Sequence, residues 1–190
     1  VADAAGVPLT GELAQCVYLS LVSDTGSFTH GNTSAAVFTL AARLVANGLD
    51  AAAIREKLDN QWSMPKTKLW GKLMQTLSLE CDGTVAVCPV TMEEIGSFGA
   101  VREDLEGFAE QMRRIKGVRV AALIRQDPGN RCKLSLRSSG SDDVRSVAAF
   151  FGGGGHLNAA GATIDDADMD AVTRQTIQAI QDITFGAGEK

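Results

Sequence analysis

Apolar residues recur at helical spacing through the first third of the chain. After the N-cap candidate Thr10, apolar positions three to four residues apart predict a helix over residues 10–22. A second helix is expected from residue 33 or 34 to residue 46, where Asn47-Gly48 ends it, and a third over residues 51–58. This part of the chain is therefore predicted to consist of helices and loops.

From about residue 69 onward, helical and extended periods alternate. Extended segments flank Gly-containing turns, which predicts one hairpin over residues 77–90 and a second over residues 118–138. This alternation indicates an α/β fold with a small, largely antiparallel or mixed sheet flanked by helices. A change in composition near residues 60–68 predicts two domains, residues 1–62 and 63–190. The helices expected in the second domain begin at Pro65 and at the capping box Thr91–Glu94, and cover residues 105–115, 144–151 and 169–183.

The composition is that of a globular protein. Hydrophobic residues make up 45% and charged residues 22% of the 190 residues, which excludes disorder and collagen-like repeats. No stretch approaches the ~20 apolar residues that span a bilayer, so no membrane partner is expected. The net charge of -5 argues against a general nucleic-acid coat.

Thiols and carboxylates are the side chains from which a metal site could be built. Cys16, Cys81, Cys88 and Cys132 lack zinc-type spacing, so we expect reduced, mostly buried thiols in a cytoplasmic protein. With two histidines in the chain, any metal would rest largely on carboxylates. Asp24, in a Ser-Asp-Thr-Gly-Ser loop, could present an oxygen to a metal, or it could form an Asx-turn or a helix cap.

Basic residues concentrate in one segment. Between Arg113 and Arg145 the chain contains nine Lys and Arg residues and three Asp residues. Such a segment in an acidic protein indicates either a local anion site or a solvated strand and helix face. Arg113 lies in the last turn of its expected helix, where a cation also stabilises the helix dipole.

One strand of the second hairpin presents polar groups at alternate positions. Leu134 and Leu136 are expected to face the core, which places Ser135 and Arg137, with Lys133, on the opposite face. A guanidinium and a hydroxyl fixed on a sheet surface could hold a phosphate. The alternative is an exposed arginine on an edge strand.

Four consecutive glycines, Gly152 to Gly155, precede His156. Glycines lack side-chain packing and cost backbone entropy, so a run of four needs a reason. Backbone N–H groups could approach an anion there, with a following helix terminus and His156 adding positive charge, and Gly161 would extend the small-residue surface. A flexible loop with a solvated histidine is the alternative.

Several motifs together resemble one family. Gly152-Gly-Gly-Gly-His-Leu-Asn-Ala-Ala-Gly161 resembles the GGGH-x-x-A-A-G signature of the DHHA1 domain, the C-terminal domain of DHH-family phosphoesterases. Ser135-Leu-Arg-Ser138 is similar to the family's S-x-R-S strand, and Asp24-Thr-Gly-Ser-Phe28 to the last metal-ligand motif of the preceding DHH domain. Glu106-Gly107 and the segment Arg113–Val118 resemble its E-G…R-x-I-x-G-V helix. The nearest branch is the RecJ-like oligoribonuclease and pAp-phosphatase group.

The resemblance implies an enzyme and assigns its site. In this family two divalent metals, usually manganese, activate a water that attacks a phosphoester. Carried over to this chain, Asp24 is a metal ligand, while Arg113, Arg137 and His156 hold the substrate phosphate and terminal nucleotide. The remaining residues that the resemblance assigns to substrate binding are Ser135, Gly153, Gly154, Gly155 and Gly161.

This sequence departs from the family pattern in two places. The Asp-His-His motif that names the family does not occur in the 190 residues, and Glu110 occupies the position where this branch often has Asn. We therefore expect the tail of a DHH domain in residues 1–62 and a DHHA1 domain in residues 63–190. Because most metal ligands are missing, we expect these 190 residues to bind substrate without metal-dependent turnover.

Three functions follow from these observations. The first is the C-terminal part of a manganese-dependent phosphoesterase that acts on short single-stranded RNA or DNA, pAp or a related nucleotide. The second is a nucleotide-binding module without chemistry, which would have no use for the Asp24 ligand. The third is a domain that mainly mediates association, for which a homodimer is one assembly.

Overall fold

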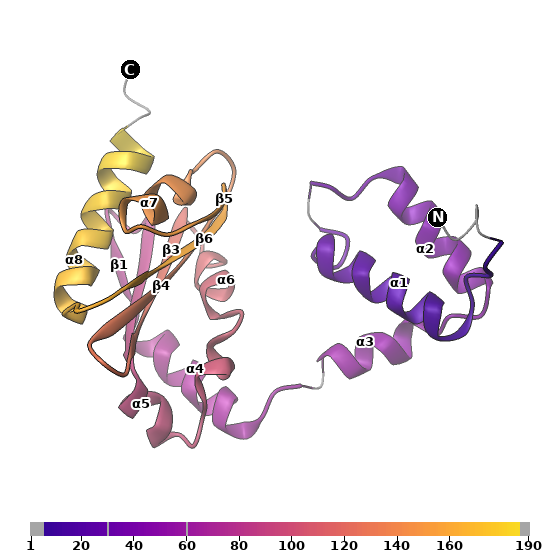
Figure 1. Ribbon diagram of the computed structural model, residues 1–190, viewed down its shortest axis with the longest axis horizontal. Coiled ribbons are helices and arrows are strands. Elements are labelled where there is room, and N and C mark those ends of the chain that lie inside the picture. Colours follow the sequence, from indigo (N-terminus) through magenta and orange to yellow (C-terminus); the bar gives the residue numbers. More distant parts are fainter. Residues whose placement is uncertain (1–5, 30, 60, 187–190) are drawn as a thin grey trace. The chain divides into compact units, whose positions relative to one another are not determined.

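The computed structural model describes residues 6–29, 31–59 and 61–186. The chain divides into two compact units, Val1–Trp62 and Ser63–Lys190, which we call the helical unit and the sheet unit (Figure 1). Each unit has its own hydrophobic core. Mixed α/β architecture, expected from the alternating pattern, is confirmed.

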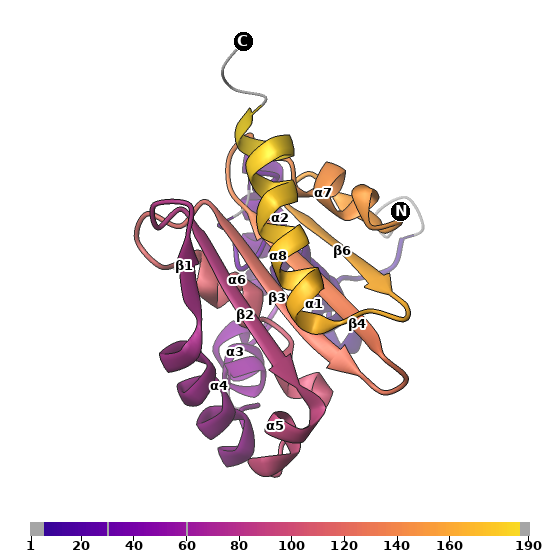
Figure 2. The ribbon, with the colours of Figure 1, turned by 90° about the vertical axis from the view of Figure 1, so that its left-hand side faces the viewer.

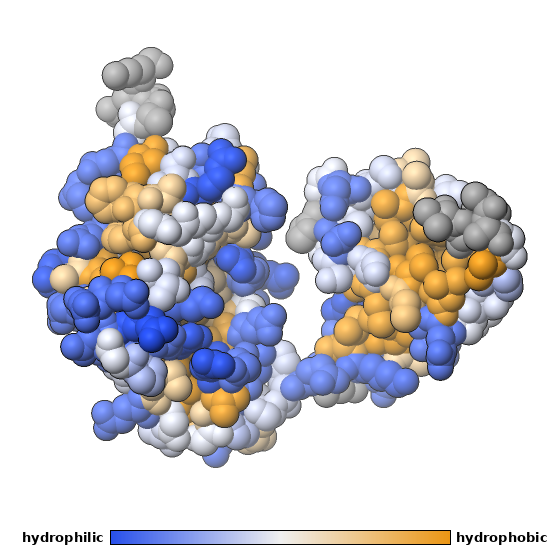
Figure 3. Space-filling view, viewed as in Figure 1, coloured by the Kyte–Doolittle hydropathy of each residue, from blue (hydrophilic) through white to orange (hydrophobic). Residues whose placement is uncertain are grey.

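The helical unit contains the three predicted helices, α1 (Gly11–Asp24), α2 (Ala35–Ala46) and α3 (Ala51–Asp59). Its core cluster is small, formed by Leu9, Ala14, Leu44 and Leu49. Large apolar side chains stay exposed, which Figure 3 shows as orange surface over α1 and α2. Within the described residues, no single helix is long and apolar enough to cross a membrane; α2 and α3 meet that criterion only jointly, with a bend of 108° between them.

The sheet unit is built on a six-stranded mixed sheet with the strand order β1-β2-β3-β4-β6-β5 (Figure 2). Strands β2 and β3 run parallel, and the other four pairings are antiparallel. Both predicted hairpins are therefore confirmed, as β1–β2 and β3–β4. The strands are β1 (Ser78–Glu80), β2 (Val85–Thr91), β3 (Val120–Asp127), β4 (Arg131–Ser138), β5 (Gly154–His156) and β6 (Ala159–Ile164).

Helices cover the two faces of this sheet unequally. One face packs against α7 (Val144–Phe150), α8 (Met169–Ala179) and the π-helical turn η2 (Ile180–Phe185) across β2, β3, β4 and β6. The other face packs against α4 (Met64–Thr76), α5 (Met92–Ser97) and α6 (Phe108–Arg113), which cover mainly β2 and β3. On that second face, the outward residues of β4, β6 and β5 stay exposed or half-buried.

The helix predicted over residues 105–115 is wrong in its extent. The chain forms a short 3-10 helix, η1 (Arg102–Leu105), followed by α6. Gly107 separates them with φ 86, a left-handed conformation that a side chain would strain. The indole N–H of Trp70 donates to the Asp104 carbonyl at 2.7 Å, which fixes the turn against α4. The predicted helix over 169–183 is likewise divided, into α8 and η2.

The four-glycine segment is structured differently from the predicted anion loop. The N–H groups of Gly152 and Gly153 donate to the carbonyls of Ala149 and Ala148, so they close the end of α7. Gly154 begins strand β5, which pairs antiparallel with β6. Because the glycine run leads into strand β5, no helix N-terminus follows it to contribute positive charge, and that part of the prediction is wrong.

Glycine is required in this segment by packing between strands. A Cβ on Gly153 would lie 2.2 Å from the Gly161 carbonyl oxygen, and one on Gly155 2.5 Å from the Ala159 carbonyl oxygen. A Cβ on Gly161 would lie 2.6 Å from the Leu134 carbonyl oxygen. These distances are shorter than any van der Waals contact, so the backbone of β5, β6 and β4 can approach as it does only with glycine at these positions.

All four cysteines are free thiols. Cys88 and Cys132 are buried, Cys81 is half-buried and Cys16 is exposed. Burial raises the pKa of the Cys88 thiol to about 12, which keeps it protonated and unreactive at neutral pH. The cytoplasmic location expected from the reduced thiols stays a prediction.

Gly153→Ala is expected to destabilise the sheet unit by at least about 2 kcal/mol, because the added methyl group must displace backbone atoms of β6. Gly154→Ala is the matched control: no atom lies within 4 Å of its added Cβ, so its stability should stay within about 1 kcal/mol of the wild type. Urea unfolding followed by tryptophan fluorescence measures both. Equal midpoints for the two variants would contradict the packing role of Gly153.

Candidate functional site

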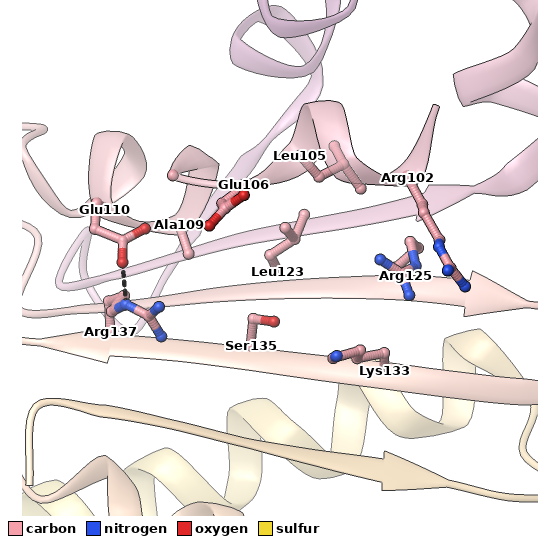
Figure 4. Close-up of a pocket in the computed structure, with 11 residues that line it drawn as sticks. Arg102, Leu105, Glu106, Ala109, Glu110, Leu123, Arg125, Lys133, Ser135 and Arg137 are labelled. Atoms are coloured by element: carbon pink, nitrogen blue, oxygen red, sulfur yellow. Dashed lines mark hydrogen bonds and ion pairs between the residues drawn. The ribbon is translucent and has the colours of Figure 1, made fainter. Parts of the chain in front are cut away.

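A pocket lies where η1 and α6 meet β3 and β4, with a volume of ≈ 210 Å³ (Figure 4). Its floor is the outward face of β4, where Lys133, Ser135 and Arg137 follow one another at alternate positions. The burial pattern of β4 alternates as the sequence predicted, with Leu134 and Leu136 in the core. The residues that line the pocket are Arg102, Leu105, Glu106, Gly107, Ala109, Glu110, Leu123, Arg125, Lys133, Ser135 and Arg137.

Arg137 closes one end of the pocket in an ion pair with Glu110 of α6 (Figure 4). Its Nε donates to the Glu110 carboxylate, and its Nη1 donates to the Leu136 carbonyl at 2.9 Å. The guanidinium is therefore held in one orientation from two sides, while 30% of the side chain stays exposed. Glu110 entered the sequence analysis only as a departure from the family pattern, and the structure places it against the predicted phosphate-binding arginine.

The other end of the pocket is lined by Arg102, Arg125 and Lys133. Arg125 donates to Asp127 through Nε and Nη2, the latter at 2.8 Å, and the two side chains are 14% and 19% exposed. These hydrogen bonds lower the pKa of the Asp127 carboxyl below its usual range. Arg102 pairs with its neighbour Glu103 at 2.6 Å on the surface.

The sequence pattern was not used to predict Arg102 or Arg125 as pocket residues, although both line the pocket. Arg125 pairs in register with Lys133 across the β3–β4 hairpin, so the alternation that placed Lys133 on the outward face also places Arg125 there. That signal was present in the sequence. Arg102 carried no comparable signal, because it reaches the pocket from η1, a turn whose position depends on Trp70 and Gly107.

His156 and Arg137 lie on the same face of the sheet, beside the pocket. Ala159 of β6 pairs with both, so the three residues form one register row from β5 to β4. Two interstrand spacings put the Cα atoms of His156 and Arg137 about 10 Å apart. A methyl group is the only side chain between them, which leaves room for both long side chains to meet one ligand.

A second row, in which the β5 and β6 positions are glycines, runs parallel to the first. Gly154 pairs with Gly161, and Gly161 pairs with Ser135. These rows combine into a flat backbone surface bordered by Ser135, Arg137 and His156. We call this surface the glycine floor, defined by Gly154, Gly161 and Ala159. It brings together most residues that the resemblance assigned to substrate binding.

Arg113 stands apart from this arrangement. It is the last residue of α6, half-buried, and is not among the pocket-lining residues. Its position at the helix C-terminus fits the competing explanation, stabilisation of the helix dipole.

Two other motif residues hold the loop after β4. The Ser138 hydroxyl donates to the Asp142 carbonyl at 2.6 Å, and the Asn158 amide donates to the Ser138 hydroxyl at 2.9 Å. Arg119 donates to the buried Asp142 carboxylate at 3.0 Å through Nε. These residues of the two motifs therefore act by fixing the backbone that joins β4 to α7.

The basic segment is less available to anions than its composition suggests. Five of its nine cations, at positions 119, 125, 131, 137 and 145, form ion pairs with acidic side chains. Three of these partners lie within the segment and two, Glu110 and Asp165, come from elsewhere in the chain. The described residues thus pair more than half of the segment's cations with carboxylates.

Asp24 is the last residue of α1 and is exposed. Thr25 and Asn32 order the loop that follows: the Thr25 hydroxyl accepts from the Phe28 N–H at 3.0 Å, and the Asn32 amide donates to the Asp24 carbonyl at 3.1 Å. Among the described residues, no group of three or more His, Cys, Asp or Glu side chains could hold a metal ion. These residues therefore do not by themselves fit a two-metal site.

Comparison with known proteins identifies the family. Residues 82–182, more than half of the chain, match the model of the DHHA1 domain. The chain belongs to the DHHA1 domain family. The match contains the whole of β2, β3, β4, β5 and β6, and with them the pocket and the glycine floor.

Relatives match nearly the whole chain. The bifunctional oligoribonuclease and PAP phosphatase NrnA of Thermus thermophilus is 30% identical over 187 residues, covering 98% of this chain and 55% of that protein. The protein of the same name from Bacillus subtilis is 25% identical over 175 residues, covering 90% of this chain and 55% of that protein. The chain thus spans about half the length of these curated relatives.

A solved structure has the same fold. An exopolyphosphatase-related protein from Bacteroides fragilis superposes with a TM-score of 0.87 at 31% sequence identity, covering 95% of this chain and 53% of that one. The names of the two NrnA relatives, oligoribonuclease and PAP phosphatase, agree with the branch that the motifs resemble.

Asp127→Asn is expected to destabilise the protein by about 1–2 kcal/mol at pH 7, because it leaves the Arg125 guanidinium without its anionic partner. The folded-state pKa of Asp127 is lowered, so its ionised form stabilises the fold above the unfolded-state pKa of about 3.9. The difference between wild type and variant should shrink as the pH falls below that value and vanish once the folded-state carboxyl is protonated.

The control for this prediction is Asp165→Asn. Asp165 pairs with Arg131 at 3.3 Å but is 79% exposed, so its loss should not change stability measurably. Urea unfolding at a series of pH values compares the variants. A difference between wild type and Asp127→Asn that persists unchanged at pH 2 would contradict the ionic origin of the effect.

Proposed function

We propose that this chain is the substrate-binding part of a DHH-family phosphoesterase that hydrolyses short oligoribonucleotides, pAp or related nucleotides. The observation that carries the proposal is the convergence of Arg137, His156 and Ser135 around the glycine floor. The names of the NrnA relatives support this choice of substrate.

Each part of the site has a role in this proposal. The Arg137 guanidinium uses Nε and Nη1 internally, and its Nη2 has no hydrogen bond among the described residues, so it can donate to a phosphate oxygen. His156 and the Ser135 hydroxyl supply further donors from the same face. The glycine floor lets a ribose or base lie close to the backbone, because the Ala159 methyl group is the only side chain that rises from it.

Manganese belongs to the proposal through the family resemblance. Of the expected ligands, Asp24 is the one that this chain contributes, and the described residues do not complete a site around it. We therefore derive no chemical step through a metal from these residues. These residues supply recognition. Arg137, His156 and Ser135 hold the phosphate, and the glycine floor leaves space for the nucleoside.

Arg137→Gln and His156→Ala are each expected to weaken pAp binding by about 10- to 100-fold, because each removes a charge-assisted hydrogen bond worth about 1.5–3 kcal/mol. Isothermal titration calorimetry with the 190-residue chain measures the affinities. Arg174→Gln removes the same charge from an exposed position on α8 and should bind pAp like the wild type. Equal affinities for pAp in the wild type and all three variants would contradict the proposal.

Glu110→Gln is expected to strengthen pAp binding by about fivefold or more, because the carboxylate repels an incoming phosphate. The amide can still accept the hydrogen bond from Arg137 Nε, so the guanidinium keeps its orientation. The net charge of the site becomes more positive by one, because the carboxylate charge is removed. The same titration tests it. Weaker binding by Glu110→Gln would mean that the carboxylate itself contacts the substrate.

A binding module without chemistry is the second candidate. It is favoured by the lack of a metal cluster among the described residues. Both candidate functions predict that the 190 residues bind nucleotide. Only the phosphoesterase proposal requires Asp24 to be a metal ligand. With manganese present, we expect the 190-residue chain to bind pAp but release no phosphate from it; phosphate release would show that the chain contains a complete active site.

A further inference from the structure

We propose that the Lys133 end of the pocket is a second phosphate subsite, so that the protein binds a chain of linked phosphates at two points along β4. This inference rests on the proposed function, because it takes Arg137 as the first subsite. It concerns Lys133, Arg125 and Arg102, to which neither the family motifs nor the relatives' names assign a role. It would make oligonucleotides of three or more nucleotides better ligands than pAp.

The spacing along β4 supports two separate subsites. Lys133 and Arg137 are four residues apart on one strand and share a face, so their Cα atoms are about 13 Å apart. Ser135 lies between them, and the three side chains border one continuous pocket (Figure 4). A single phosphate cannot contact both ends, whereas an oligonucleotide carries a charge at every linkage.

Charge is distributed unevenly along this pocket. The Lys133 end has three cations, Arg102, Arg125 and Lys133. Glu103 pairs with Arg102 and Asp127 with Arg125, which leaves one net positive charge at this end. At the Arg137 end, Glu106 and Glu110 outnumber the single guanidinium, which leaves one net negative charge. The net positive charge at the Lys133 end therefore attracts a further phosphate there, in addition to the one that the Arg137 guanidinium holds by hydrogen bonding.

The groups at the Lys133 end are also positioned in advance. Arg125 is fixed by two hydrogen bonds to Asp127 and is 14% exposed, so little conformational entropy remains to be lost on binding. Its Nη1 has no hydrogen bond within the part of the chain that the structure describes. Lys133 is exposed, and its ammonium forms no hydrogen bond or ion pair with the described residues, so it can meet a phosphate.

The remaining chemistry of the pocket suits a nucleotide linker between the two phosphates. Leu123, Leu105 and Ala109 form an apolar wall opposite Ser135. Nucleosides lying along β4 would contact this wall, while phosphates of the same strand meet cations at either end. The ligand class is therefore a short single-stranded oligonucleotide longer than pAp, whose linked phosphates reach both ends of the pocket.

The test compares Lys133→Gln with the wild type on ligands of different length. The trinucleotide pApApA should bind Lys133→Gln about 5- to 20-fold more weakly, while pAp should bind within twofold of the wild type. The slope of log affinity against log salt concentration for pApApA should fall by about 0.7, as expected when one phosphate contact is lost from a single strand. Arg174→Gln is the charge-matched control and should change neither value.

Linear polyphosphate provides a second arm, because it carries linked phosphates without nucleosides. If the apolar wall contributes, polyphosphate should bind more weakly than pApApA. Lys133-dependent binding of polyphosphate alone, without an effect on pApApA, would overturn the assignment to an oligonucleotide.

Failure of this inference differs from failure of the proposed function. Equal loss of pAp and pApApA binding in Lys133→Gln, or no loss of either, overturns the second subsite. If Arg137→Gln still weakens pAp binding in those cases, the proposed function stands. If Arg137→Gln binds pAp like the wild type, the proposed function and the second subsite fail together. Circular dichroism of each variant confirms that the fold is retained.

Discussion

Burial of strand β3 on both faces is the constraint on which the sheet unit depends. Val120, Ala122 and Ile124 pack into one core and Ala121 and Leu123 into the other. A strand apolar on both sides must be covered on both sides, so helices lie over each face at the centre of the sheet. Strand β4 beside it is apolar on one face only. The pocket lies at the edge of the helical cover, where η1 and α6 meet β3 and β4.

Close approach of β5, β6 and β4 explains the glycines and the binding surface together. Gly153, Gly155 and Gly161 are needed because carbonyl oxygens of neighbouring strands occupy the space of a Cβ. The same lack of side chains leaves the glycine floor flat beside Arg137 and His156. Gly161 is thus required by packing between strands and, in the proposed function, also leaves space for a ligand.

Electrostatics of the site depend on which charges the fold pairs. Nine basic residues in one segment indicated an anion site or a solvated face. Most of these cations meet carboxylates, some of them brought from distant parts of the chain. Glu110 neutralises Arg137, whereas Lys133 keeps its charge beside Arg125, which Asp127 holds in place. A count of charges along the sequence could not separate these cases.

Local patterns in the sequence determined the helices of the first third, both hairpins, the alternation of β4 and the family motifs, because each depends on neighbouring residues. The order of the strands, the edge position of β5 and the break at Gly107 were decided only in the tertiary structure. Each of these depends on contacts between distant segments, such as Trp70 with Asp104 or Gly161 with Leu134. The same holds for the pairing of Arg137 with Glu110, since two residues 27 positions apart meet only when α6 packs on the sheet.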